Sequence, residues 1–574
     1  MGRATRLTRY TCLFALLALL LIDVPAALAQ RLATGPQVLT FYSAVDDTEQ
    51  PYGLYLPPNF DEQKQYPLVI MLHGAGSNHR LALRRVFGKS NAPDETDVEA
   101  SRYFPEWQDV DYIVASPLAR GTAGYQGIPE QDVYDVLADV KRRFKIDENR
   151  VYLTGLSMGG GGTLWLGLTR PDVWAAIAAV CPAPPAGTDQ LAGNALNFPV
   201  HFFQGEADPV VPVQGTRDWV KRLEELGTQV MYAEYPGVDH TSWVQAYQDN
   251  FIFSWFDKFK RNPFPDQVRF SSQQHKYNKA YWVRFDQLIL GELASIDARF
   301  TEPNRLQITT TNLPAFTLRL GGHPKYNPDK PLQLTINGKK VRAEAADSIS
   351  LSLRKRKWIV APYQPAATAK HAQLAGPMRE AVAGRHIYVY GTADNPSQEV
   401  LSVRMQQATD AANWSEYRGA FLGRVTVFPR VLADKEVRPS DRESADLVLF
   451  GTKETNSLIA EISDRLPVHL NPADTASYGL AYVFPNNGQY VLISSGLPWW
   501  RGHEAQGLAG LMPDVIKATV DLKDFVLFKG SRKGVIAEGY FDNDWRLTEA
   551  DRKKLNATGV VTIPVPPKSV SSRK

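Results

Sequence analysis

The sequence predicts an α/β domain with a parallel sheet, then a small antiparallel β-sandwich-like domain and then a C-terminal α/β region. Three observations lead to this prediction. Apolar runs alternate with helical patterns at residues 40–262, alternation of period two follows at 266–360, and the α/β pattern returns at 376–550. Of the 574 residues, 44% are hydrophobic and 22% are charged, which excludes collagen-like, coiled-coil and wholly disordered chains.

The first region contains near-continuous apolar strands, which are typical of a parallel sheet covered on both faces. Between two of these strands, apolar residues from Val133 to Phe144 recur at helical spacing. Strand–helix–strand order predicts right-handed βαβ units. The expected strands are Tyr66–Leu72, Tyr112–Ala115, Arg150–Thr154, Ala175–Val180 and Pro199–Phe203.

The second region consists of short alternating segments, which favour a small antiparallel sandwich. Leu332–Ile336 runs into Asn337-Gly338, a two-residue turn that favours a hairpin. Residues 361–375, rich in Ala and Pro, are interpreted as a linker. The other expected strands are Tyr281–Phe285, Ala294–Phe300, Arg305–Thr309 and Phe316–Leu320.

The third region repeats the strand-then-helix pattern. His386–Tyr390 precedes a helical stretch that reaches Trp414, Asp446–Phe450 precedes Thr452–Leu466, and Gln489–Ile493 precedes further helix. The region has neither a second serine motif between strand and helix nor a G-x-G-x-x-G. We therefore assign no catalysis to it.

The N-terminus carries the features of a targeting segment. Three arginines precede an apolar run, Cys12–Ile22, which is followed by Ala27-Leu28-Ala29. This pattern predicts a signal peptide at residues 1–29, cleaved after Ala29, with an uncleaved membrane anchor as the alternative. A secreted or periplasmic protein would retain one cysteine, Cys181, so its stability would come from its cores. The Pro/Ser/Lys-rich residues 564–574 are expected to be disordered.

The charge balance argues against two classes of partner. The formal net charge is +3, and cleavage of the signal peptide would remove three arginines and one aspartate and leave about +1. A nearly neutral chain indicates no nucleic acid and no anionic membrane as partner. None of the ten histidines lies in H-E-x-x-H or another close ligand spacing, so we expect no metal and no cofactor. The oligomeric state is not indicated.

The residues that indicate chemistry are Gly155-Leu156-Ser157-Met158-Gly159, directly after the strand Arg150–Thr154 and directly before a helix. A strand-to-helix turn this tight holds its serine at strained backbone angles, and small flanking glycines permit it. An earlier apolar strand ends in His73-Gly74-Ala75-Gly76. Backbone N–H groups there, with that of Met158, could stabilise a developing oxyanion.

An acid and a histidine follow the serine along the chain. Asp208 comes just after the strand Pro199–Phe203, and His240 lies in a loop after the next strand. Serine, acid, then histidine is the order of α/β hydrolases. His240 would take the proton of the serine, while Asp208 would orient the imidazole. Asp208 could instead cap the helix that follows it, and Glu206 and Asp239 are competing acids.

Residues 40–262 resemble secreted bacterial esterases of the α/β-hydrolase superfamily. They are most similar to the poly(hydroxyalkanoate)-depolymerase-like, feruloyl-esterase-like and prolyl-oligopeptidase-like group. The resemblance implies a catalytic triad of Ser157, Asp208 and His240, with Ala75 and Met158 as oxyanion donors. The matching segments are Tyr52–Pro58, Val69–Gly74, Arg150–Gly160 and Gly205–Asp208.

The leading hypothesis is an exported serine carboxylic-ester hydrolase that works through an acyl-enzyme. Its ester substrate could be an acyl or feruloyl group on polysaccharide. The second hypothesis is a peptidase of prolyl-oligopeptidase type, disfavoured because such enzymes carry a β-propeller before the catalytic domain and only about ten residues separate Arg31 from the first expected strand. The third is a non-enzymatic carbohydrate-binding or adhesion protein. Tyr277, Tyr281 and Trp282 could stack on sugars, although core packing is the better expectation.

Overall fold

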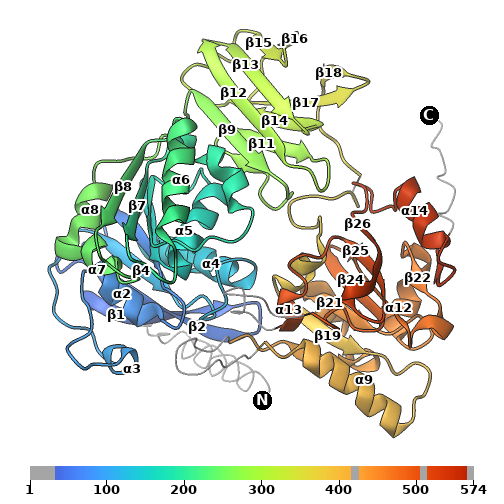
Figure 1. Ribbon diagram of the computed structural model, residues 1–574. Helices are drawn as coiled ribbons and strands as arrows, with labels where there is room; N and C mark the ends of the chain where they lie inside the picture. The colour runs from blue at the N-terminus through green and yellow to red at the C-terminus, as the bar shows by residue number, and fades with distance from the viewer. Residues whose placement is uncertain (1–32, 367, 415–425, 504–513, 565–574) are drawn as a thin grey trace, which may run out of the picture.

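The computed structural model is organised in three lobes, each built around its own sheet or pair of sheets (Figure 1). The expected signal peptide and, apart from Pro564, the expected disordered tail lie outside the residues that the structure describes. Among the helices of the described stretches, none is both long and apolar enough to span a bilayer. These stretches are residues 33–366, 368–414, 426–503 and 514–564.

The first lobe contains an eight-stranded sheet with the order β1-β2-β4-β3-β5-β6-β7-β8. β2 is antiparallel to both β1 and β4, and the strands from β4 to β8 are parallel. The sheet begins at Gly35 rather than near residue 40, because β1 is an edge strand with half-exposed side chains and no apolar run marks it. The strands are β1 (Gly35–Ser43), β2 (Thr48–Leu56), β3 (Tyr66–Leu72), β4 (Ile113–Pro117), β5 (Ile146–Leu156), β6 (Ala176–Val180), β7 (Val200–Gly205) and β8 (Val230–Tyr235).

Helices cover both faces of this sheet, as the continuous apolar strands require. In β3, Leu68 and Ile70 pack into one core, while Val69 and Met71 pack into the other. The first core includes residues of α4, α5 and α6, and the second includes residues of α2 and α8. The helices are α2 (His79–Val86), α3 (Asp97–Ala100), α4 (Ile128–Arg143), α5 (Met158–Thr169), α6 (Val213–Glu225), α7 (Trp243–Ala246) and α8 (Phe251–Phe256), with 3-10 turns η1 (Thr188–Asn197) and η2 (Gln248–Asn250).

The second lobe is a sandwich of two five-stranded sheets, β10-β11-β14-β17-β18 and β16-β15-β13-β12-β9. The prediction of a purely antiparallel sandwich is wrong in one pair, because β13 and β15 are parallel. The chain crosses to the other sheet as β14 before it returns as β15, so the two strands are not joined by a hairpin. The strands are β9 (Gln267–Ser272), β10 (Lys279–Ala280), β11 (Val283–Gln287), β12 (Ala294–Glu302), β13 (Arg305–Thr311), β14 (Ala315–Arg319), β15 (Leu332–Ile336), β16 (Lys339–Ala343), β17 (Ser348–Arg354) and β18 (Lys357–Val360).

The third lobe has a seven-stranded mixed sheet, β20-β19-β21-β24-β23-β25-β26, in which β20, β19, β21 and β24 are parallel. Its strands and its small β22–β27 pair are β19 (His386–Tyr390), β20 (Arg430–Ala433), β21 (Asp446–Phe450), β22 (His469–Leu470), β23 (Tyr478–Asn486), β24 (Gln489–Gly496), β25 (Phe525–Lys529), β26 (Val535–Gly539) and β27 (Val561–Thr562). Its helices are η3 (Met378–Val382), α9 (Gln398–Ala411), η4 (Asp434–Glu436), α11 (Pro439–Ser444), α12 (Ser457–Ile462), η5 (Ser463–Arg465), η6 (Pro472–Asp474), α13 (Asp514–Lys517), η8 (Arg532–Gly534) and α14 (Glu549–Asn556).

The helix expected over Thr452–Leu466 is shorter than the sequence indicates. A turn precedes it, in which the Thr455 N–H donates to the carbonyl of Thr452 (3.1 Å). Asn456 then caps α12, because its side chain accepts from the N–H groups of Leu458 and Ile459. Asparagine competes with the helix for backbone donors, so the helix begins after it.

The segment interpreted as a linker, residues 361–375, has no helix or strand among its described residues, but part of it is buried. Lys370 is fully buried and forms an ion pair with Asp524, just before β25. The segment therefore packs on the third lobe.

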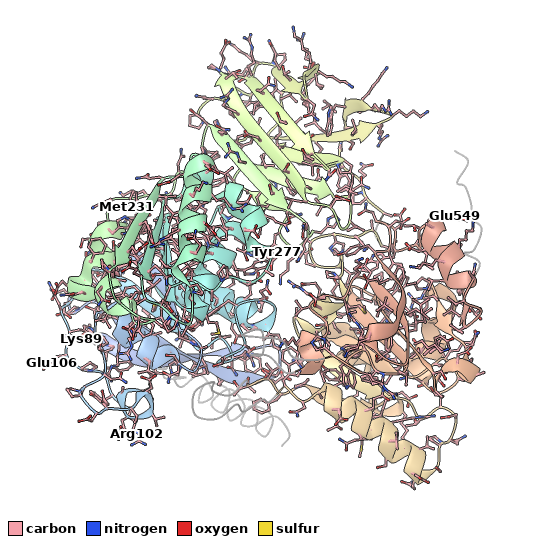
Figure 2. The ribbon with its side chains drawn as sticks, viewed as in Figure 1. Lys89, Arg102, Glu106, Met231, Tyr277 and Glu549 are labelled. Carbon is pink, nitrogen blue, oxygen red and sulfur yellow. The ribbon has the colours of Figure 1, made fainter. Side chains whose placement is uncertain are left out.

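The aromatic residues considered for sugar stacking pack inside the protein. Trp282 is 1% exposed and lies in the sandwich core. Tyr277 extends from the sandwich into a core of the first lobe, where its hydroxyl donates to Glu130 (2.6 Å). Figure 2 labels Tyr277 at the meeting point of the lobes. Tyr281 is half-buried and donates to the Pro171 carbonyl (2.9 Å).

Arg120 joins the first and third lobes. Its guanidinium is fully buried and contacts the carboxylates of Asp46 and Asp132, each at 2.7 Å. It also donates to the carbonyl of Thr426 (3.2 Å), whose own N–H donates back to the Arg120 carbonyl (3.3 Å). One cation therefore balances two buried carboxylates and contacts the third lobe.

We predict that Arg120→Met destabilises the protein by about 3–5 kcal/mol, because it leaves Asp46 and Asp132 buried without a cation. Urea and thermal midpoints measure the effect. Arg305→Met is the matched control, since Arg305 is half exposed and its pair with Glu302 contributes about 0–1 kcal/mol. Equal midpoints for the two variants would contradict the prediction.

Candidate active site

Ser157 occupies the turn between β5 and α5 with φ 55° and ψ −117°. A Cβ atom at Gly155 would lie 2.5 Å from the Gly159 carbonyl oxygen, and one at Gly159 would lie 2.3 Å from that of Leu72. Both glycines are therefore required by close backbone contact. The Ser157 N–H donates to the Val180 carbonyl (2.9 Å), which anchors the turn to β6. The turn has the geometry expected of a nucleophile elbow.

His240 lies between Ser157 and Asp208. Its Nε2 is 2.9 Å from Ser157 Oγ, and its Nδ1 is 2.8 Å from Asp208 Oδ2. The Asp208 side chain is fully buried, whereas that of His240 is 20% exposed. Because Asp208 can only accept when ionised, Nδ1 carries the proton and Nε2 faces the serine as an acceptor. The structure thus brings together the three residues that the sequence predicted.

Asp208 is held by donors on both of its oxygens. Its Oδ1 accepts from the backbone N–H groups of Val210 and Val211, each at 2.9 Å. Its Oδ2 accepts from Gln204 Nε2 (3.0 Å) as well as from His240. Gln204 is fully buried in β7, and its Oε1 accepts from Thr216 Oγ1 (2.9 Å). Sequence reasoning did not identify Gln204, since a lone glutamine at the end of a strand carries no motif.

The alternatives for the acid have other roles. The N-cap position of α6 is Pro212, so Asp208 does not cap that helix. Glu206 is exposed and accepts from the Gly237 N–H (3.2 Å). Asp239 is also exposed and accepts from the N–H and hydroxyl of Thr241. Of these three carboxylates, Asp208 is the one that contacts the His240 ring.

The loop that carries His240 passes very close to the end of β7. A Cβ atom at Gly205 would lie 2.3 Å from the carbonyl oxygens of both Val238 and Asp239. Any side chain at position 205 would push this loop, and with it His240, away from Ser157. Gly205 is also the first residue of Gly205–Asp208, one of the segments that carry the resemblance to α/β-hydrolase esterases. The close approach of the His240 loop explains why a glycine is needed at this position.

The loop after β3 runs beside the serine. A Cβ atom at Gly74 would lie 3.5 Å from Ser157 Cβ, which places Ala75 next to the candidate nucleophile. The Gly76 N–H is already used, since it donates to Thr122 Oγ1 (2.9 Å). Met158 is the first residue of α5, so its N–H has no acceptor within the helix. These positions suit the two predicted oxyanion donors.

His73 supports this loop from within the protein. It is fully buried, with Nδ1 2.8 Å from the Gly74 carbonyl and Nε2 2.8 Å from the Leu118 carbonyl. Burial lowers the pKa of His73, which disfavours the imidazolium form. Tyr125 donates to the His73 carbonyl (3.0 Å) and fixes the same turn.

A buried thiol lies beside the acid and the histidine. The side-chain ligand atoms of Cys181, Asp208 and His240 lie within 4.8 Å of one another, the single such cluster in the described part of the chain. Burial raises the pKa of Cys181 to about 12, which disfavours the thiolate that metal binding needs. The donor set therefore does not suit a metal ion, and Cys181 acts as a small apolar residue under the His240 loop.

Comparison with known proteins identifies the first lobe. Residues 60–255 match the family model described as Phospholipase/Carboxylesterase. The first lobe has the α/β-hydrolase fold. The predicted resemblance and fold class are confirmed for this lobe by the family match and by the strand order.

Named relatives match parts of the hydrolase lobe. The chain is 37% identical over 127 residues to a poly(3-hydroxybutyrate) depolymerase of Ralstonia pickettii, covering 21% of this chain and 23% of that protein. It is 27% identical over 220 residues to feruloyl esterase D of Neurospora crassa, covering 37% of this chain and 72% of that one. The chain therefore spans about a quarter of the depolymerase and about three quarters of the fungal esterase.

Two solved structures are also similar to this part of the chain. One is a thermostable esterase (28% identity, TM-score 0.32), with 39% of this chain and 63% of that chain covered. Another is a CE1 ferulic acid esterase of Anaeromyces mucronatus (21% identity, TM-score 0.31), with 40% and 92% covered. The fold assignment rests on the strand order and the family match.

We predict that Gln204→Met slows the reaction of Ser157 with an alkyl fluorophosphonate by about fivefold, as expected for loss of one hydrogen bond to Asp208. Intact-protein mass spectrometry follows the labelling. Gln214→Met is the control, because Gln214 contacts Asp218 on the exposed face of α6. Equal labelling rates for Gln204→Met and the wild type would show that Gln204 does not position the acid.

Proposed function

We propose that the protein is a serine carboxylic-ester hydrolase. The observation that carries this proposal is the continuous hydrogen-bonded chain Asp208–His240–Ser157, whose serine lies in a strained strand-to-helix turn. Neutral serine is a weak nucleophile and needs an oriented base within hydrogen-bond distance. The chain supplies that base and the acid that orients it.

The reaction follows from the roles of these residues. His240 Nε2 takes the proton of Ser157 as Oγ attacks the ester carbonyl, and Asp208 stabilises the imidazolium that forms. The backbone N–H groups of Ala75 and Met158 would bind the oxyanion of the tetrahedral intermediate. His240 then protonates the leaving alcohol, and an acyl-enzyme remains on Ser157. Water, activated by the same histidine, releases the acid.

Acyl or feruloyl esters attached to polysaccharide are the proposed substrates. The names of the relatives support this choice, since a feruloyl esterase and a poly(3-hydroxybutyrate) depolymerase both cleave carboxylic esters. The nearly neutral charge of the chain is consistent with a neutral ester. The hydrogen bonds that link Asp208, His240 and Ser157 argue against a protein that only binds, because binding alone does not need an activated serine.

We further propose that the protein is exported to the periplasm or secreted. Support comes from the arginines, the short apolar run and the Ala27-Leu28-Ala29 site of the sequence. In a bacterial host that expresses the whole chain, the soluble exported form is expected to begin at Gln30, as read by N-terminal sequencing. Recovery of the intact chain in the membrane fraction would instead indicate an uncleaved anchor.

We predict that the wild type hydrolyses p-nitrophenyl acetate and a feruloyl or acetyl-xylan ester, and that Ser157→Ala lowers kcat by at least about a thousandfold. Ser254→Ala, on the exposed side of α8, is the control and keeps full activity. Cleavage of proline peptides without ester turnover would contradict the proposal and favour a peptidase. Saccharide binding without any turnover would favour the non-enzymatic alternative.

A further inference from the structure

A second candidate site lies in the third lobe. A cavity of about 120 Å³ is lined by residues of the β21–α12 loop, of β23 and β24, and of the β22–β27 pair. No residue of the Ser157 site lines it. Whatever this cavity binds is therefore bound separately from ester hydrolysis.

The position of the cavity in the sheet is typical of ligand sites. β21 and β24 are parallel neighbours, and Thr452 and Ser495, which line the cavity, lie at their carboxyl ends. In open α/β sheets, ligands bind outside the carboxyl ends of the strands. The topology therefore favours a ligand site at this edge of the sheet.

The neighbouring crevice, between β19 and β21, is closed. Asp434 accepts from the N–H and hydroxyl of Thr392 and from the Ser457 N–H, and so ties the loops together. A Cβ atom at Gly391 would lie only 2.1 Å from the Thr455 carbonyl oxygen. Backbone thus fills the crevice between β19 and β21, where the strand order reverses. The cavity lies at the next pair of strands, β21 and β24.

One buried hydroxyl group of the cavity wall is unsatisfied, and a tyrosine adds a second hydroxyl to the wall. Thr452 is 7% exposed, and its Oγ1 has no hydrogen-bond partner in the described part of the chain. Tyr482, which is 1% exposed, also lines the cavity, and burial raises the pKa of its phenol. A buried hydroxyl without a partner costs free energy, so such groups indicate a bound molecule that pairs with them.

The charge of the cavity wall favours a neutral ligand. Lys453 and Glu454 are adjacent, opposite in sign and exposed. His469 Nε2 donates to the Ser463 carbonyl (3.0 Å), and burial lowers the pKa of this histidine, so its Nδ1 is a neutral acceptor. Among the described residues, the cluster of potential metal ligands is that of Cys181, Asp208 and His240, which lies outside this cavity.

The cavity wall also has an apolar part. Leu470 and Ile493 contribute aliphatic surface beside the hydroxyl and imidazole groups. A ligand that matches such a wall carries both donors and acceptors on a compact carbon framework. A sugar ring has this chemistry. An anion would face the Glu454 carboxylate beside Lys453, and a hydrocarbon would leave the Thr452 hydroxyl unpaired.

We propose that this cavity binds one neutral monosaccharide unit, which gives the chain a saccharide site separate from the hydrolase site. A cavity of about 150 Å³ holds a six-membered ring such as benzene. The space of about 120 Å³ is smaller than this, so we propose that one face of a sugar ring enters it while the rest of the ring stays outside. This inference does not depend on the proposed ester hydrolysis.

Calorimetric titration of the full chain with D-xylose, L-arabinose, D-glucose and D-galactose tests the proposal. A ligand of about ten heavy atoms is expected to bind with a millimolar dissociation constant, so titration to about 50 mM suffices. We expect saturable binding of at least one sugar. Thr452→Val and Tyr482→Phe should each weaken it about threefold to tenfold, since each removes one hydrogen bond.

The variants distinguish ligand binding from a structural role. Thr452→Val removes a hydroxyl that has no partner among the described residues, so its urea midpoint should equal or exceed that of the wild type. Thr409→Val, on the exposed face of α9, is the matched control and should bind sugar like the wild type. Ser157→Ala should also bind like the wild type, whatever its effect on hydrolysis.

Three outcomes would overturn the proposal. The first is no saturable binding of any of the four sugars, as for a cavity filled only with water. The second is binding that neither Thr452→Val nor Tyr482→Phe weakens. The third is binding that Ser157→Ala abolishes, which would place the sugar at the hydrolase site.

Discussion

The backbone conformation of Ser157 is the constraint on which the hydrolase lobe depends. A non-glycine residue at φ 55° is unfavourable by itself and persists only where surrounding structure enforces it. Here α5 is pressed against the carboxyl edge of the sheet, with Gly159 against β3 and Gly160 against the Val180 carbonyl. The run of glycines at the start of α5 permits this contact, at a cost in helix propensity. Burial of Leu164 and Trp165 further along the helix offsets that cost.

The other site residues come from separate strands that end at the same edge of the sheet. β3 supplies the loop with Ala75, β7 leads to Asp208, and the segment after β8 carries His240. Each is held by its own neighbours. The loop with Ala75 is held by the His73 ring, which contacts the Gly74 carbonyl, and Asp208 is held by Gln204. The His240 loop is held close to β7 at Gly205. The site is thus preorganised by groups that do not themselves contact a substrate.

The sequence predicts the elements that local pattern determines and misses those that depend on distant contacts. The β5–Ser157–α5 turn is predictable because its glycines and apolar strand are contiguous, and Asp208 and His240 follow from chain order. Gln204 is not, because its role arises when β7 folds against Asp208 and Thr216. The parallel β13–β15 pair is also missed, since alternation shows which face a residue lies on but not the direction of the partner strand.

One loop relates the third lobe to the hydrolase site. Residues 118–127 follow β4, and within them Thr122 accepts from the Gly76 N–H beside the expected oxyanion donors. Two residues earlier, Arg120 has φ 62° and is fixed by Asp46, Asp132 and the Thr426 carbonyl. An arginine at positive φ needs strong anchors, and the buried ion pairs supply them. The same contacts therefore serve two purposes, because they hold the third lobe on the first and keep Thr122 in place to orient the loop beside Ser157.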